Sequence, residues 1–109
     1  MSDETTTVDE LRILVENFVA ERDWHRFHNP KNLSMSLAIE AAELMEHFQW
    51  LTLDEGAQVK LDPERKQDVG EELADCLAYV IAIANTLEID LSETLRAKMI
   101  RNAAKYPPP

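Results

Sequence analysis

The sequence is poor in glycine, in cysteine and in long apolar runs, and each shortage excludes a class of protein. Two glycines in 109 residues argue against a sheet with tight turns and, with abundant Ala, Leu, Glu and Met, favour helices. The single cysteine, Cys76, cannot close an internal disulfide, which fits a reducing compartment, so we expect a cytoplasmic protein. The polar start MSDETTT lacks the features of a secretory signal, and no apolar run is long enough for a membrane span.

Positive charge is also scarce. Eleven Lys and Arg face 21 Asp and Glu, for a formal net charge of −10. Such a surface repels polyphosphate backbones on average, so we expect no binding to nucleic acid polymers. The length predicts one domain over residues 1–109 whose core is thin, and association with further copies would supplement that core. We therefore predict a homo-oligomer.

Capping signals and apolar spacing predict an all-α, four-helix bundle-like fold. Thr7 and Glu10 form a capping box before the first helix, Asp62 caps the third, and Asp90 caps the fourth. The expected helices are Val8–Asp23, Leu33–Leu51, Glu64–Leu87 and a fourth from Asp90 to about Lys105. Residues Trp24–Asn32 and Thr52–Leu61 are expected as connections, and residues 1–6 and 107–109 as flexible tails.

Acidic residues form one stripe on each of the second and third expected helices, whose other faces are mostly apolar. Glu40 and Glu43 are three residues apart on the second helix, and Glu72 and Asp75 repeat this spacing on the third. The spacing places both carboxylates of each pair on neighbouring turns of one face. Because a helix that is apolar most of the way round is normally enclosed by protein, we expect these acids to be enclosed as well.

Four enclosed carboxylates would repel one another and take up protons unless a cation lies among them. A hard divalent cation with oxygen ligands fits this set, and Mg²⁺ is the natural candidate. A solvated acidic face is the ordinary alternative, which the apolar surroundings on both helices disfavour. A di-iron centre would need Glu-x-x-His motifs that neither pair supplies. Zinc is disfavoured because Cys76 is alone and the three histidines lack ligand spacing.

Four blocks follow one another along most of the chain, from about Glu16 to Pro107: ERDWHRFHNPKNL, EAAELMEHFQW, EELADCLAYVIAIAN and KMIRNAAKYP. Together they resemble the all-α nucleoside triphosphate pyrophosphohydrolases of the MazG-like superfamily, in particular the dCTP pyrophosphatase branch. The resemblance implies hydrolysis between the α- and β-phosphates, giving a nucleoside monophosphate and pyrophosphate. It further implies a homotetramer, with dCTP or a modified pyrimidine nucleotide as substrate in nucleotide pool sanitation.

The resemblance also implies roles for individual residues. It assigns Mg²⁺ binding to Glu40, Glu43, Glu72 and Asp75, and among these Glu43 is our choice for orienting or deprotonating the attacking water. It assigns base stacking to Trp24 and Trp50, with Tyr79 nearby, although Trp50 alone reads equally as a core residue. His28 matches a family block and contacts sugar or phosphate, or else orders the loop.

Cationic and polar side chains of the fourth helix are candidates for the remaining phosphate oxygens. Lys98, Asn102 and Lys105 are spaced three and four apart on one face, although both lysines also suit a solvated helix end. The chain departs from the family at His47, where an aliphatic residue is more common. We expect His47 to be a core histidine rather than a partner of Glu43.

Two other functions are compatible with these residues. The first is a related pyrophosphohydrolase acting on dUTP or phosphoribosyl-ATP, against which the two tryptophans argue. The second is a non-catalytic helical interaction module whose acids bind a cation for assembly only. Release of pyrophosphate from nucleotides distinguishes the second from any enzyme.

Overall fold

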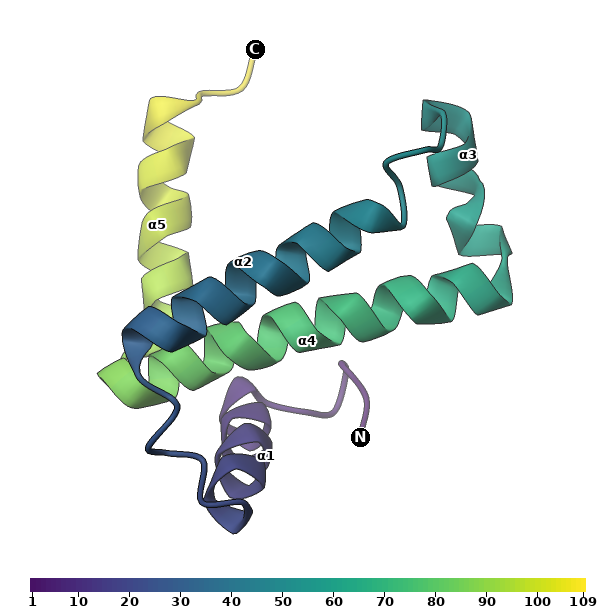
Figure 1. Ribbon diagram of the computed structural model, residues 1–109. Helices are drawn as coiled ribbons and strands as arrows, with labels where there is room; N and C mark the ends of the chain where they lie inside the picture. Colours follow the sequence, from purple (N-terminus) through teal and green to yellow (C-terminus); the bar gives the residue numbers. More distant parts are fainter.

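The computed structural model describes all 109 residues, and every regular element in it is a helix (Figure 1). In chain order the elements are α1 (Val8–Glu21), α2 (Pro30–Glu46), α3 (Leu53–Gln58), the short 3₁₀ helix η1 (Val59–Leu61), α4 (Pro63–Leu87) and α5 (Leu91–Lys105). The four long helices correspond to the four that the sequence predicts, and the all-α class is confirmed. None of the helices is long and apolar enough to cross a lipid bilayer.

The second long helix begins and ends earlier than the sequence analysis predicts. Asn29 caps it, because its side-chain oxygen accepts a hydrogen bond from the backbone N–H of Asn32 at 2.9 Å. Pro30 then occupies the first helical position, where a missing N–H is harmless. The expected loop Trp24–Asn32 is therefore too long. At its other end α2 stops at Glu46, so the prediction that it reaches Leu51 is wrong.

The stretch from Thr52 to Leu61, expected as a connection, contains α3 and η1. Thr52 and Glu55 form a capping box in which the N–H of Glu55 donates to the Thr52 hydroxyl at 3.1 Å and the N–H of Thr52 donates to the Glu55 carboxylate at 2.9 Å. Hydrogen bonding of the Glu55 carboxylate to the Thr52 backbone N–H, and then to the Thr52 side chain, lowers the pKa of Glu55. The prediction of a connection here is wrong, because Thr52 and Glu55 have the spacing of a capping box and start a helix. An ordered helical corner therefore joins α2 to α4.

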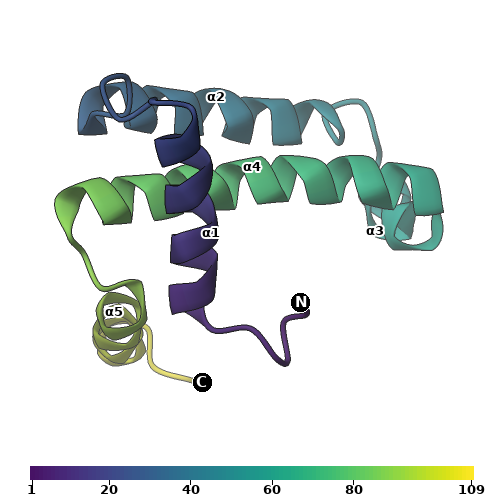
Figure 2. The ribbon, with the colours of Figure 1, turned by 90° about the horizontal axis from the view of Figure 1, so that it is seen from below.

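Helices α2 and α4 lie side by side and antiparallel (Figures 1 and 2). The α3 corner is at one end of this pair, and α1 crosses α4 toward the opposite end. Arg12 fastens α1 there, because its guanidinium donates to the Asn85 side chain at 2.9 Å and to the backbone oxygens of Ala84 and Ile89. The buried core consists of Val19 of α1, Leu33 of α2, Val59 of η1, and Ile81, Ala82 and Ala84 of α4.

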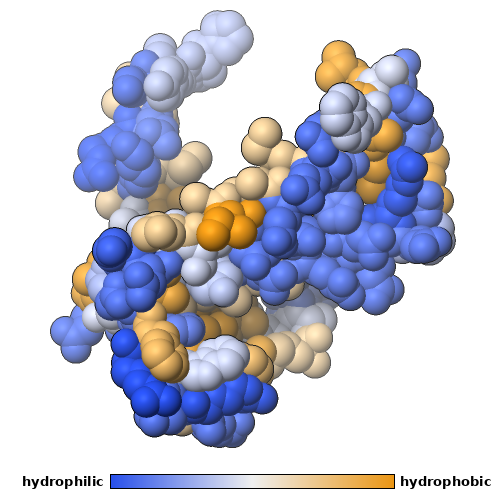
Figure 3. All heavy atoms as spheres, in the orientation of Figure 1, coloured by the Kyte–Doolittle hydropathy of each residue, from blue (hydrophilic) through white to orange (hydrophobic).

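One chain does not close into a bundle. The radius of gyration is 16.5 Å, against about 13 Å for a compact domain of this length. Helix α5 packs extensively against no other helix and stands apart from the α2–α4 pair across an open gap (Figures 1 and 3). Apolar side chains of α2, among them Met35, Ile39 and Met45, are more than half exposed. The expectation that α2 is enclosed on most sides therefore fails within a single chain.

Candidate metal centre

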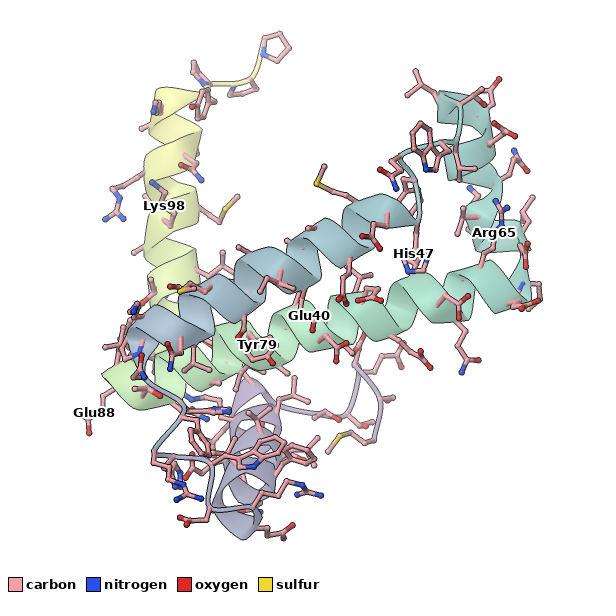
Figure 4. The ribbon with its side chains drawn as sticks, in the orientation of Figure 1. Glu40, His47, Arg65, Tyr79, Glu88 and Lys98 are labelled. Atoms are coloured by element: carbon pink, nitrogen blue, oxygen red, sulfur yellow. The ribbon has the colours of Figure 1, made fainter.

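Three of the four predicted carboxylates come together where α2 faces α4. Glu40 and Glu43 project from α2 and Glu72 from α4, and each offers a carboxylate oxygen within 4.8 Å of the other two. Figure 4 shows Glu40, the labelled member of this set, between the two helices. All three residues are partly buried. The spacing of three within α2 aligns the first two carboxylates, and the antiparallel packing brings the third to the same height. Two helices thus supply one set of oxygen donors.

The electrostatics of this cluster favour a cation. One oxygen of Glu40 and one of Glu72, Oε2 in each, are buried and have no hydrogen-bond partner. Burial, together with the neighbouring carboxylates Glu43 and Asp75, raises the pKa of Glu40 to about 7. No Lys or Arg nitrogen lies within 4.0 Å of these carboxylates. A hard divalent cation such as Mg²⁺ fits this donor set, because it would satisfy the unpartnered oxygens and the negative charge together.

The fourth predicted ligand, Asp75, lies outside this cluster. Its side chain is exposed, although its charge still contributes to the raised pKa of Glu40. Its role as a ligand stays a prediction. The neighbouring Cys76 is partly buried, and burial together with the charges of Glu40 and Glu72 raises the pKa of its thiol. This thiol is therefore a poor nucleophile at neutral pH.

His47 differs from both sequence-based readings. It forms the C-cap of α2, and its Nε2 lies 3.6 Å from Oε1 of Glu72 on α4. Figure 4 shows the His47 side chain at the end of α2, directed toward α4. The side chain is 32% exposed, so the prediction of a core histidine is wrong. Its carboxylate neighbour is Glu72, whereas the alternative hypothesis predicts Glu43. The contact crosses from α2 to α4, and spacing along one helix could not indicate it.

The two tryptophans lie at opposite ends of α2. Trp24 precedes α2, and its ring packs edge-on against Phe18 with ring centroids 5.6 Å apart. Trp50 follows α2 and is 86% exposed, so within one chain it is not a core residue. Because a helix of 17 residues is roughly 25 Å long, the two rings of one chain cannot grip the same base.

The other predicted substrate contacts are also spread over the molecule. Tyr79 is partly buried on α4, one turn beyond Asp75. Lys98, Asn102 and Lys105 are on α5, and Figure 4 shows Lys98 well apart from Glu40. One chain therefore does not bring its phosphate candidates to its carboxylate cluster.

His28 faces a different part of the molecule. Burial lowers the pKa of its imidazole, and its backbone oxygen accepts a hydrogen bond from the Thr86 hydroxyl at 3.4 Å. It lines a cleft of about 910 Å³ between α1, the following loop and the α4–α5 turn, to which Arg12 also contributes. None of the three clustered glutamates lines that cleft. The contacts of Arg12 could not be predicted from the sequence, because its hydrogen-bond acceptors are 72 to 77 residues away along the chain.

Comparison with known proteins agrees with the resemblance drawn from the sequence. Over 101 residues, 93% of this chain, it is 40% identical to dCTP pyrophosphatase 1 of Homo sapiens and 39% identical to that of Bos taurus. The chain spans about 60% of the length of these curated relatives. A crystal structure of a pyrophosphatase from Archaeoglobus fulgidus is similar over 99% of both chains, with 36% identity and a TM-score of 0.83. The model of the MazG-like family matches residues 35–109, and the chain belongs to this family.

Proposed function

We propose that this protein hydrolyses a nucleoside triphosphate to a nucleoside monophosphate and pyrophosphate at the carboxylate cluster of α2 and α4. The observation that carries the proposal is the set of three glutamates, Glu40, Glu43 and Glu72, with two buried oxygens that lack partners. The similarity to proteins named dCTP pyrophosphatase and pyrophosphatase supports the choice of reaction. Within this class we favour dCTP or a modified pyrimidine nucleotide, which suits a role in sanitation of the nucleotide pool.

The cluster is suited to this reaction because phosphoryl transfer depends mainly on positioning and on charge neutralisation. Glu40, Glu43 and Glu72 would hold Mg²⁺, with Asp75 as a further ligand from the same face of α4. When bound, Mg²⁺ offsets the charge of the phosphate oxygens and acidifies water. We assign Glu43 the task of orienting the attacking water and accepting its proton, as the new P–O bond forms and the bond to pyrophosphate breaks.

We further propose that the complete substrate site is assembled from several copies, as a homotetramer. The exposed apolar side chains of α2 and the isolated α5 support association, because large exposed apolar surface is uncommon on monomers. Association would also supply what one chain lacks near its cluster: a second tryptophan for the base and the α5 residues Lys98, Asn102 and Lys105 for phosphate. His28 and Tyr79 remain candidates for contacts to the nucleotide. The single thiol of Cys76 supports a reducing, cytoplasmic location.

Pyrophosphate release from a panel of nucleotides tests the proposal. The panel comprises dCTP, a modified pyrimidine triphosphate, dUTP and phosphoribosyl-ATP, each with Mg²⁺ and with EDTA. We expect Glu43→Gln to lower kcat/KM by about 100-fold or more, the usual effect of removing a general base. The matched control is Glu46→Gln, which removes an exposed carboxylate from the same helix outside the cluster and should leave turnover unchanged.

Circular dichroism and sizing must show that both variants keep the fold and the assembly of the parent. Background release from every nucleotide would favour the non-catalytic interaction module. Equal turnover by Glu43→Gln and the parent would remove Glu43 from the mechanism. Preferred turnover of dUTP or phosphoribosyl-ATP would keep the reaction class and overturn the choice of substrate.

A further inference from the structure

His47 lies beside the carboxylate cluster without belonging to it. Its backbone N–H bonds to the oxygens of Leu44 and Met45, which fixes the residue at the end of α2. From there its ring reaches across to α4, where Nε2 is 3.6 Å from Oε1 of Glu72. It is the only basic side chain with a nitrogen within 4.0 Å of any carboxylate of the cluster.

The two oxygens of Glu72 have different surroundings. Oε1 faces the imidazole of His47, whereas Oε2 is buried and has no partner. The Glu72 side chain is 20% exposed, so few water molecules compete for either oxygen. A donor at Oε1 limits rotation of the carboxylate and leaves Oε2 free for another partner. Carboxylates that bind metal ions are commonly oriented by such hydrogen bonds.

We infer that His47 is a positioning residue that holds Oε1 of Glu72 so that Oε2 is presented to a cation shared with Glu40 and Glu43. The inference rests on the proposed metal-dependent function. The separation of 3.6 Å is slightly longer than a hydrogen bond, so the inferred contact requires Nε2 of His47 and Oε1 of Glu72 to move closer together when the cation binds. His47 acts through Glu72 and is not itself a metal ligand, because it is outside the set of groups whose donor atoms lie within 4.8 Å of one another.

Binding of Mn²⁺ to the metal-free protein tests this inference without reference to turnover. Free Mn²⁺ is counted by electron paramagnetic resonance during titration of the full chain. We expect His47→Leu, which removes the donor, to weaken Mn²⁺ binding about tenfold or more. His47→Gln keeps an N–H at the same reach and should restore affinity to within about threefold of the parent.

A matched control comes from a second histidine–carboxylate contact. His25→Leu removes a histidine whose Nε2 lies 2.6 Å from Glu16, on residues outside the cluster, and should leave Mn²⁺ affinity unchanged. Thermal melting of each metal-free variant separates affinity from folding, because a purely structural role for His47 would lower the melting temperature and not the affinity. If His47→Leu does not fold, His47→Asn serves instead, since its shorter amide falls short of Glu72.

Pulsed electron paramagnetic resonance of bound Mn²⁺ adds a spectroscopic readout. We expect no directly coordinated nitrogen in the parent. A nitrogen ligand that disappears in His47→Gln, or an unchanged affinity in His47→Leu, would overturn the positioning role while leaving the metal centre intact. A parent protein that binds no Mn²⁺ would overturn the metal centre, and this inference with it.

Discussion

The α2–α4 pair and α5 are both helical and both carry apolar side chains, yet they differ in what those side chains contact. In the pair, Leu33, Ile81 and Ala84 are almost fully buried against neighbouring helices. In α5, Leu95 and Ile100 are more than 60% exposed, and the helix packs extensively against nothing else in the chain. The pair also carries the carboxylate cluster, whereas α5 carries the cationic candidates for phosphate.

The difference shows that one chain packs the α2–α4 pair and forms its carboxylate cluster, but leaves the apolar side chains of α5 exposed. Burial of apolar surface stabilises the pair and at the same time brings Glu40 and Glu72 to one height between the helices. Helix α5 has a capped start at Asp90, so local signals suffice to form it, but nothing in the chain covers its apolar face. Its stability must therefore come from propensity and capping or from contact with another copy.

The largest expected effect in this comparison is on stability when core packing in the pair is removed. Ile81 is 2% exposed, so Ile81→Ala should lower the free energy of unfolding by about 2–5 kcal/mol. Leu95→Ala removes a similar side chain from α5, where it contacts little within one chain. At low protein concentration its effect should stay within about 0.5 kcal/mol.

Chemical denaturation over a hundredfold range of protein concentration checks both variants. If α5 packs against another copy, the effect of Leu95→Ala grows with concentration, whereas that of Ile81→Ala is present throughout. A small effect of Ile81→Ala would contradict the assignment of Ile81 to the buried core. A large effect of Leu95→Ala on the dissociated chain would mean that α5 packs within its own chain.

A smaller expected effect is a dependence of stability on pH that comes from the carboxylate cluster and not from acidic residues elsewhere. Because the pKa of Glu40 is about 7 in the folded chain, against an ordinary value of 4.5, the folded state binds more protons than the unfolded state between these values. The metal-free protein should therefore lose stability as pH rises from about 5 to 7, with a fall in melting temperature of roughly 5 °C. Thermal melts in EDTA measure this slope.

Two variants test whether the pH dependence of stability comes from Glu40. Glu40→Gln imitates the protonated side chain and should flatten the slope, whereas Glu93→Gln removes an exposed acid from the first turn of α5 and should leave it in place. A melting temperature that does not depend on pH in the parent would contradict the crowding of carboxylates at Glu40. Added Mg²⁺ should reverse the loss near pH 7, because the cation binds the ionised form.

Local signals predicted the helices well and the connections less well. Thr7, Asp62 and Asp90 are N-caps as expected, because a side-chain cap needs only its own helix. The capping box at Thr52 and Glu55 has the same character, but the glycine and mixed polarity of this stretch favour a loop in a prediction from sequence. Asp23 and Glu88 have positive φ values of 54° and 55°, a backbone conformation that glycine usually adopts. Because neither residue is a glycine, the sequence does not indicate these two turns.

The sequence predicts those parts of the site that depend on residue spacing along a single helix. The spacing of Glu40 and Glu43 places two donors together, and the repeat of that spacing on α4 indicates that Glu72 joins them. Which acid of α4 faces α2 depends on the register and rotation of the two helices, so Asp75 could not be told from Glu72. The contact of His47 with Glu72 depends on the same register.

The smallest expected effect on stability concerns the N-terminal half of α4, because the buried residues of this helix are all in its C-terminal half. Gly70 lies in the interior of α4, and a Cβ there would meet no atom within 4 Å. Because glycine loses more backbone entropy than alanine in a helix, Gly70→Ala should raise the free energy of unfolding by about 0.5–1 kcal/mol. Denaturation at low protein concentration measures the gain. If Gly70→Ala instead lowers stability, and does so only when copies associate, another chain covers this turn of α4. The packed and open regions would then belong to the assembly and not to one chain.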